Sequence, residues 1–214
     1  MTAIDPNLSE GRAWASCLAY LEEFCNPYPG VPYPLSTVAY GQILWVLTEA
    51  IGARAVLEIG IGPSAMSGMI FAHSMGTRGG GTLYSIDVET DRPAEFNRLK
   101  AAELMVDWQT TYGDSLTVAD GFPESLQVDL LYIDGDHDFA HAYGDTKAYF
   151  KYLRPGGYLV IDDYPGCYGV IEARQKLQAE GFGQFLHLSH HPPHSNGRLL
   201  LQKPRPETYA GVPI

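Results

Sequence analysis

The sequence predicts an α/β fold in which an open, mostly parallel sheet carries helices on both faces. Apolar runs typical of strands alternate with helix-compatible segments over most of the chain, and such alternation joins parallel strands through right-handed crossovers. Two strand-like runs close the chain with a connection too short for a crossover helix, so this last pair should be antiparallel. The 214 residues, 45% of them hydrophobic, suit one globular domain.

Each element follows from its own pattern of apolar residues and turn residues. Strands are expected, in order, at Ala55–Ile59, Thr82–Ile86, Trp108–Tyr112, Val128–Ile133 and Tyr158–Ile161, and within "QFLHLSH" and "GRLLLQKP". Helices are expected at Ser9–Phe24, Ser36–Ile51, Ser64–Gly76, Pro93–Val106, Phe139–Leu153 and Tyr168–Glu180. We expect residues 1–52 to form a helical cap or lid and residues 53–214 to form the ligand-binding part of the domain.

Charge and composition exclude several classes of function. The chain has 14 Lys and Arg against 25 Asp and Glu, a net charge of -11, which argues against binding a nucleic-acid backbone and favours a small-molecule or basic partner. Neither a bilayer-spanning apolar run nor a signal-peptide pattern is visible, so we expect a cytoplasmic protein without membrane contact. Three cysteines without CxxC spacing suggest neither disulfides nor a zinc site.

A glycine-rich turn follows the first strong strand in "LEIGIGPSAMSG". Gly60 and Gly62 would let a ligand approach the backbone and the amides of the next helix. Asp87 ends the next strand, where an acid commonly binds a ribose diol. Both features also fit a nicotinamide cofactor or a tight turn without a ligand. Glu58, two residues before Gly60, favours a ligand with a cationic amine over a diphosphate.

Acidic residues also gather after two later strands. Asp134, Asp136 and His137 follow the strand in "LLYIDGDH", and Asp162 and Asp163 end the apolar run in "GGYLVIDDY". Neighbouring strand ends of a parallel sheet can place Asp134, Asp162 and Asp163 around one point. Three carboxylates with water would bind a hard cation such as Mg²⁺. Asp136 or His137 could then serve as a general base.

These motifs, taken in order with "YSIDVE", "YGDS" and "LRPGGYLVIDDY", resemble the class I S-adenosylmethionine-dependent methyltransferases between about Arg54 and Asp163. The resemblance implies a Rossmann-like sheet of seven strands, of which the last, "GRLLLQKP", is antiparallel. Within the class, the acids are similar to those of the metal-dependent O-methyltransferases of the catechol and macrocin types. Residues 53–214 would accordingly be the S-adenosylmethionine-binding catalytic domain.

The resemblance also implies roles for individual residues. Asp134, Asp162 and Asp163 would bind the metal, and Asp136 matches the acid that acts as base in the macrocin type, whereas His137 stands where the catechol type has lysine. For the cofactor, the resemblance implies the methionine end at Glu58, Gly60 and Gly62, the ribose hydroxyls at Asp87 and the adenine at Asp114 and Ser115. Ser64 and Asp134 are also expected to bind the cofactor.

The resulting hypothesis is an O-methyltransferase that transfers a methyl group from S-adenosylmethionine to a hydroxyl of a sugar, phenol or polyketide with the help of a divalent cation. A metal-independent N- or O-methyltransferase and a nicotinamide-dependent oxidoreductase remain alternatives. The partner is expected to be a small-molecule acceptor, and the chain could form homo-oligomers. The loop with His190, His191 and His194, and the segment "YPGVPYP", could contact that acceptor.

Overall fold

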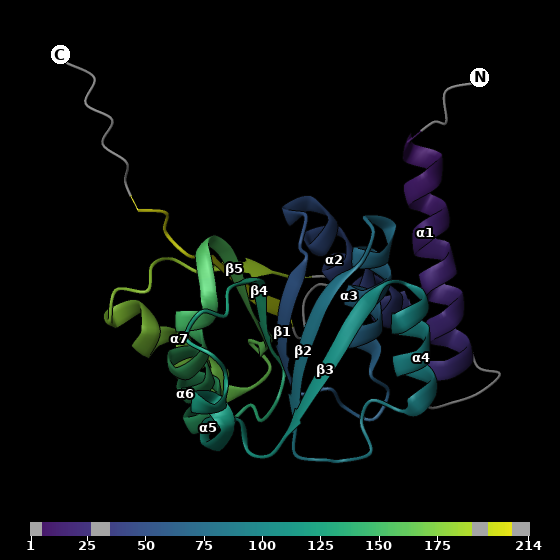
Figure 1. Cartoon of the computed structure of the whole chain (residues 1–214). Coiled ribbons are helices and arrows are strands. Elements are labelled where there is room, and N and C mark those ends of the chain that lie inside the picture. Colours follow the sequence, from purple (N-terminus) through teal and green to yellow (C-terminus); the bar gives the residue numbers. More distant parts are fainter. Residues whose placement is uncertain (1–5, 27–34, 190–196, 207–214) are drawn as a thin grey trace, which may run out of the picture.

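A computed structural model of the chain describes residues 6–26, 35–189 and 197–206. Its sheet has seven strands in the order β3-β2-β1-β4-β5-β7-β6 (Figure 1). All neighbours are parallel except that β7 runs antiparallel to β5 and to β6. This arrangement confirms the predicted fold class and the antiparallel last strand. The strands are β1 (Ala55–Ile59), β2 (Gly81–Asp87), β3 (Val106–Tyr112), β4 (Val128–Ile133), β5 (Leu153–Tyr164), β6 (Leu186–Leu188) and β7 (Gly197–Gln202).

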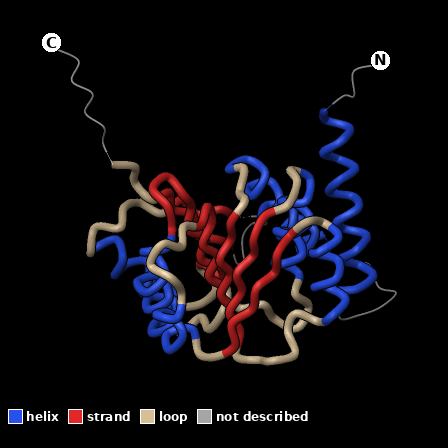
Figure 2. Tube along the Cα trace, in the orientation of Figure 1, coloured by secondary structure: helices blue, strands red, loops and turns tan. Residues whose placement is uncertain are grey.

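Helices cover both faces of the sheet, which lies between them as a middle layer (Figures 1 and 2). One face carries α1 (Pro6–Tyr20) with the π-helical turn η1 (Leu21–Cys25), α2 (Leu35–Ile51), α3 (Met66–Thr77) and α4 (Glu95–Glu103). The other face carries α5 (Ser115–Val118) with η2 (Ala119–Gly121), α6 (Phe139–Tyr149) with η3 (Phe150–Tyr152), and α7 (Tyr168–Ala179). No helix among the described residues is long and apolar enough to cross a membrane.

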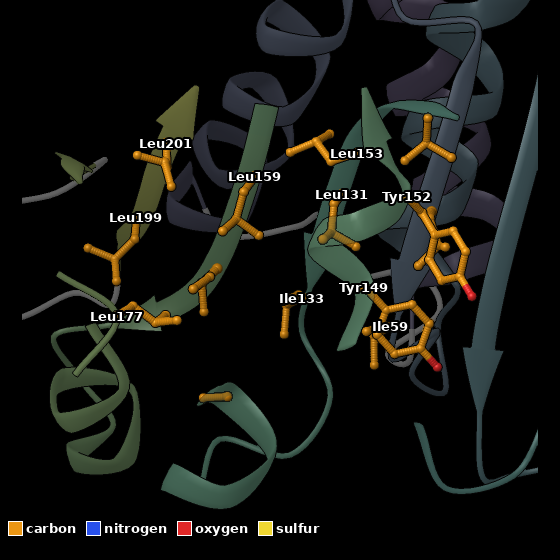
Figure 3. Close-up of a cluster of buried hydrophobic side chains, with 14 of the residues drawn as sticks. Ile59, Leu131, Ile133, Tyr149, Tyr152, Leu153, Leu159, Leu177, Leu199 and Leu201 are labelled. Carbon is orange, nitrogen blue, oxygen red and sulfur yellow. The ribbon is translucent and has the colours of Figure 1, made fainter. Parts of the chain in front are cut away.

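Two apolar cores hold these layers together, and the alternation of side chains along each strand separates them. On the α6 and α7 side, Leu131, Ile133 and Leu159 pack against residues of these helices (Figure 3). On the other side, Leu44 and Trp45 of α2 pack with α1, α3 and the sheet. The N-terminal helices therefore share a core with the sheet. Whether residues 1–52 also act as a lid stays a prediction.

Several element boundaries differ from those expected. The helix predicted for Pro93–Val106 spans only Glu95–Glu103, since Met105 has a left-handed φ of 60° and Val106 already pairs with β2. The helix predicted to reach Leu153 ends at Tyr149 and passes through η3 into β5. The α3 helix begins at Met66, after a turn. The segment "YPGVPYP" and His190, His191 and His194 lie outside the described residues.

Gly60 lets the ends of β1 and β4 approach each other closely. Its φ is +87°, and a Cβ atom placed on it would lie 2.1 Å from the carbonyl oxygen of Asp134. At the same point, where the parallel strands β1 and β4 end, the amide of Asp134 donates to the carbonyl of Ile59 at 2.8 Å. Gly62 also has a positive φ, +66°, but a Cβ there would meet nothing within 4 Å. Gly60 is therefore needed for packing as well as for backbone freedom.

This difference gives a matched pair of variants. Gly62→Ala should cost only the left-handed strain, about 1–2 kcal/mol of unfolding free energy. Gly60→Ala adds a clash with backbone that cannot move cheaply, so the total loss should be about 3 kcal/mol or more. Chemical denaturation of both variants measures the two losses, and equal losses would contradict the close contact between Gly60 and Asp134.

Candidate active site

A pocket of about 420 Å³ opens at the carboxyl edge of the parallel strands. Its walls come from the loops that follow β1, β2, β3 and β4, the edge at which open α/β sheets bind ligands. The residues that line it are Ile59, Gly60, Gly62, Ile86, Asp87, Val88, Arg92, Gly113, Asp114, Ser115, Asp134, Gly135, Asp136 and His141. The structure thus brings together most of the residues predicted for the cofactor and adds Arg92 and His141, which the sequence motifs did not assign to it.

Asp87, at the end of the neighbouring strand β2, forms hydrogen bonds with the glycine turn. Its Oδ2 accepts the amides of Ile61 and Gly62 at 2.9 and 3.2 Å, and its Oδ1 accepts the amide of Glu89 at 2.9 Å. Each carboxylate oxygen has two lone pairs, so Oδ1 of Asp87 can still accept one hydroxyl of a ligand while the carboxylate holds the turn. The acid is 8% exposed, at the wall of the pocket.

Asp114 and Ser115 form the opposite wall at the start of α5. Asp114 is the N-cap of this helix, and its Oδ1 accepts the amide of Thr117 at 3.1 Å. That bond, together with His141, lowers the pKa of Asp114 below its ordinary range. The hydroxyl of Ser115 donates to Asp145 at 2.6 Å, and burial raises the pKa of Asp145 to about 6. The hydroxyl proton of Ser115 is therefore committed to the protein.

Glu58 does not reach the pocket, although it was predicted to bind the amine of the cofactor. It is fully buried on the α3 side of β1, where its carboxylate accepts the hydroxyls of Ser67 and Ser85. Burial raises its pKa to about 7, partly offset by these two hydroxyls. Ser64, the other predicted residue of this region, lies in the turn before α3 and is not part of the pocket lining.

Asp162, which was predicted to bind the metal, has partners within the protein. It is 1% exposed and pairs with the equally buried Arg198 of β7, whose Nε lies 3.1 Å from Oδ2. The same Oδ2 accepts the hydroxyls of Tyr40, at 2.6 Å, and of Tyr132. The two hydroxyl oxygens also lie 3.2 and 2.9 Å from Asp134 Oδ2, so Asp134 and Asp162 share the two phenolic protons. We call these five residues the buried polar network.

A different trio converges beside this network. Asp134, His137 and Asp163 each place one ligand atom within 4.8 Å of the other two. His137 Nε2 lies 3.0 Å from Asp163 Oδ2 and 3.7 Å from Asp134 Oδ1. The bond to Asp163 is the main cause that raises the pKa of His137. Asp163 has a left-handed φ of 58° and lies where the pairing of β5 with β7 is irregular, and it joins this group, whereas Asp162 pairs with Arg198.

The comparison with protein families assigns the chain to a family of methyltransferase domains. Residues 57–164, just over half of it, match the family described as a methyltransferase domain, and the chain belongs to that family. With the observed strand order and the pocket at the carboxyl edge, the protein is a class I S-adenosylmethionine-dependent methyltransferase. The nicotinamide-dependent alternative is thereby overturned.

Solved structures share this fold at low identity. The chain is similar to the O-methyltransferase TomG from Streptomyces achromogenes, involved in tomaymycin synthesis and solved with S-adenosylmethionine (20% identity, 89% of each chain, TM-score 0.61). It is also similar to an O-methyltransferase from Bacillus cereus in complex with S-adenosylhomocysteine (18% identity, 94% of each chain, TM-score 0.60). A third similar structure is the Podospora anserina methyltransferase PaMTH1 bound to S-adenosylhomocysteine (14% identity, 95% and 99% of the chains, TM-score 0.65).

Among curated proteins, a short segment matches the uncharacterized protein R132 of Acanthamoeba polyphaga mimivirus. The two are 49% identical over 37 residues, which is 17% of either protein. Because the match spans so little of that relative, it identifies a shared segment and carries no activity or substrate to this chain.

The position of Glu58 can be tested through stability. Its pKa is raised from an ordinary 4.5 to about 7 in the folded state, so its stabilising contribution is complete below about pH 4.5 and is lost as the pH rises through about 7. Each pKa unit corresponds to about 1.4 kcal/mol, which makes the loss on the order of 3 kcal/mol at most. Glu58→Gln should remove this pH dependence when unfolding free energies are compared at about pH 5 and about pH 8.

The same variant separates the two interpretations of Glu58. If the carboxylate only supports the strand from inside, Glu58→Gln should bind S-adenosylmethionine within about twofold of wild type in calorimetry. An affinity loss above about tenfold, equal to 1.4 kcal/mol, in a correctly folded variant would support the prediction that Glu58 contacts the cofactor.

Proposed function

We propose that the protein transfers the methyl group of S-adenosylmethionine to a hydroxyl of a small molecule, such as a phenol, sugar or polyketide. The observation that carries this proposal is that Asp134 belongs to two neighbouring parts of the site. This residue lines the cofactor pocket and also belongs to the group with His137 and Asp163. A methyl donor in the pocket and an acceptor oxygen at that group would therefore meet beside one side chain.

The group also fits a divalent cation, with His137 in place of the predicted Asp162. Two carboxylate oxygens and one imidazole nitrogen form a mixed donor set, which suits Mn²⁺ or a similar ion as well as the predicted Mg²⁺. When bound, such a cation would lower the pKa of the acceptor hydroxyl and orient its oxygen. Asp134 and Asp163 would hold it, and His137 could join them only as neutral imidazole.

The identity of the general base depends on that cation. Without it, His137 shares a proton with Asp163 and can take one from the acceptor only after losing its own. Asp136 is an exposed carboxylate on the pocket wall, with Oδ1 accepting the amide of Asp138 at 3.1 Å. If His137 is a ligand, the exposure of Asp136 on the pocket wall supports it as the group that takes the proton of the acceptor hydroxyl.

A metal-independent methyltransferase is the second candidate, and one observation favours it. Two of the acids already have cationic partners in the protein, because Arg198 pairs with Asp162 and His137 pairs with Asp163. Protein cations could thus compensate the acids that a metal would otherwise neutralise. In that case His137 would be the base, and an amine acceptor would be as suitable as a hydroxyl.

Metal removal separates these candidates. With a cation, EDTA should abolish methyl transfer from labelled S-adenosylmethionine to a panel of phenols and sugars, and Mn²⁺ or Mg²⁺ should restore it. Calorimetry with Mn²⁺ alone should show one site, and Asp163→Asn should lose that site while it still binds S-adenosylhomocysteine. Full activity in EDTA together with no Mn²⁺ binding would establish the metal-independent enzyme instead.

The base can be identified from pH profiles of the two single variants. If Asp136 accepts the proton, Asp136→Asn should lower kcat by about 10²-fold or more, with cofactor affinity within a few fold, and His137→Gln should chiefly weaken Mn²⁺ binding. If His137 accepts it, the ascending limb of the profile should disappear in His137→Gln and persist in Asp136→Asn.

A further inference from the structure

His141 lies in the pocket wall and has no role in the proposed reaction. It stands in the first turn of α6, three residues after the N-cap Asp138. Its two ring nitrogens face carboxylates of different elements. Nδ1 lies 3.1 Å from Asp138 Oδ1, and Nε2 lies 3.5 Å from Asp114 Oδ2, at the start of α5. The side chain is 27% exposed, so it can be replaced without opening a core.

These contacts define the charge of the ring. A neutral imidazole has one donor and one acceptor nitrogen, whereas the imidazolium has two donors. Since carboxylate oxygens face both nitrogens, only the imidazolium satisfies both contacts. Asp136 Oδ2 lies 4.0 Å from Nδ1, and Asp145 follows one turn later on α6. Burial of the ring lowers its pKa, but Asp138, Asp114 and Asp136 raise it by more, so the net pKa lies above the ordinary value.

His141 thereby joins the starts of α5 and α6 across the pocket mouth. Asp114 uses its two oxygens differently, because Oδ1 caps α5 through the amide of Thr117 at 3.1 Å and Oδ2 turns to His141. Asp138 likewise caps α6 through the amide of His141 at 2.8 Å. Only the protonated ring can donate to both carboxylates at once, so deprotonation leaves Asp114 and Asp138 to compete for a single donor.

We infer that His141 is a positioning residue for the adenosyl part of the cofactor, which acts by holding the Asp114 carboxylate in place to accept the amino group of the purine. The inference rests on the proposed placement of adenine at Asp114 and Ser115. It predicts that cofactor affinity depends on the protonation of a residue that touches neither the methyl group nor the acceptor. S-adenosylmethionine and S-adenosylhomocysteine share the adenosyl group, so both should respond equally.

The test is calorimetry of S-adenosylhomocysteine binding from about pH 6 to pH 9 in wild type, His141→Gln and His141→Lys. A positioning hydrogen bond of about 1 kcal/mol corresponds to about fivefold in affinity. Wild type should lose about fivefold as the ring deprotonates, since its contribution is present only below the raised pKa. His141→Gln should be weaker by that factor at low pH and lack the step, and His141→Lys should restore the low-pH affinity.

Dividing the wild-type profile by that of His141→Gln removes the contributions of other groups that titrate, such as Glu58. Asp114→Asn and the double variant complete a cycle, in which the His141 effect should disappear once Asp114 is changed. In wild type, kcat at saturating S-adenosylmethionine should match that of His141→Gln, while KM for the cofactor rises in the variant. Circular dichroism of each variant confirms folding.

Three results would overturn the inference. If the affinity of folded His141→Gln for S-adenosylhomocysteine changes with pH as in wild type, His141 has no positioning role, while the placement of adenine at Asp114 is unaffected. Additive effects in the cycle would show that His141 does not act through Asp114. Wild-type affinity in Asp114→Asn would instead overturn the placement of adenine at Asp114, and with it the inference.

Discussion

The ion pair between Arg198 and Asp162 determines how the catalytic edge of the sheet is assembled. Arg198 comes from β7, Asp162 from β5, Tyr132 from β4 and Tyr40 from α2, and all four side chains meet around one carboxylate. The guanidinium also lies over the Tyr40 ring, 3.5 Å from its centre, and donates to the Tyr40 carbonyl at 3.0 Å. A buried charge without its partner is strongly unfavourable, so these four elements are stable only together.

This constraint divides the acids of the site into two sets. Asp162 belongs to the interior, where it secures α2 and β7 to the sheet. Asp163, the next residue, has a left-handed φ of 58° at an irregularity in the β5 and β7 pairing, and it faces His137. Asp134 connects the sets, because its Oδ2 shares the tyrosine hydroxyls with Asp162 while its Oδ1 lies near His137. Asp162, which supports the site, and Asp163, which belongs to the proposed reaction centre, are thus adjacent in the sequence.

Most of the fold could be predicted from the sequence because apolar runs of strand length are local signals. The strands Ala55–Ile59 and Val128–Ile133 match to the residue. The pocket followed from topology, since strand ends gather at one edge. The contacts that the sequence did not predict are those of site residues with partners distant in sequence. Nothing near Asp162 indicates that Arg198, 36 residues later, would pair with it. Of the two serines that contact Glu58, Ser67 depends on where α3 begins and Ser85 on the pairing of β2 with β1. His141 had only its spacing from Asp145 as a signal.

Arg198 lies near the start of β7, so the ion pair with Asp162 can form only after this late strand has been synthesised. Until the ribosome has released this strand, Asp162 lacks its only cationic partner among the described residues, and β5 lacks its neighbour. A nascent chain could already form the glycine turn and the strands around it, yet the edge that holds Asp134 and Asp163 would remain incomplete. This edge of the sheet is therefore complete only once β7 has paired with β5.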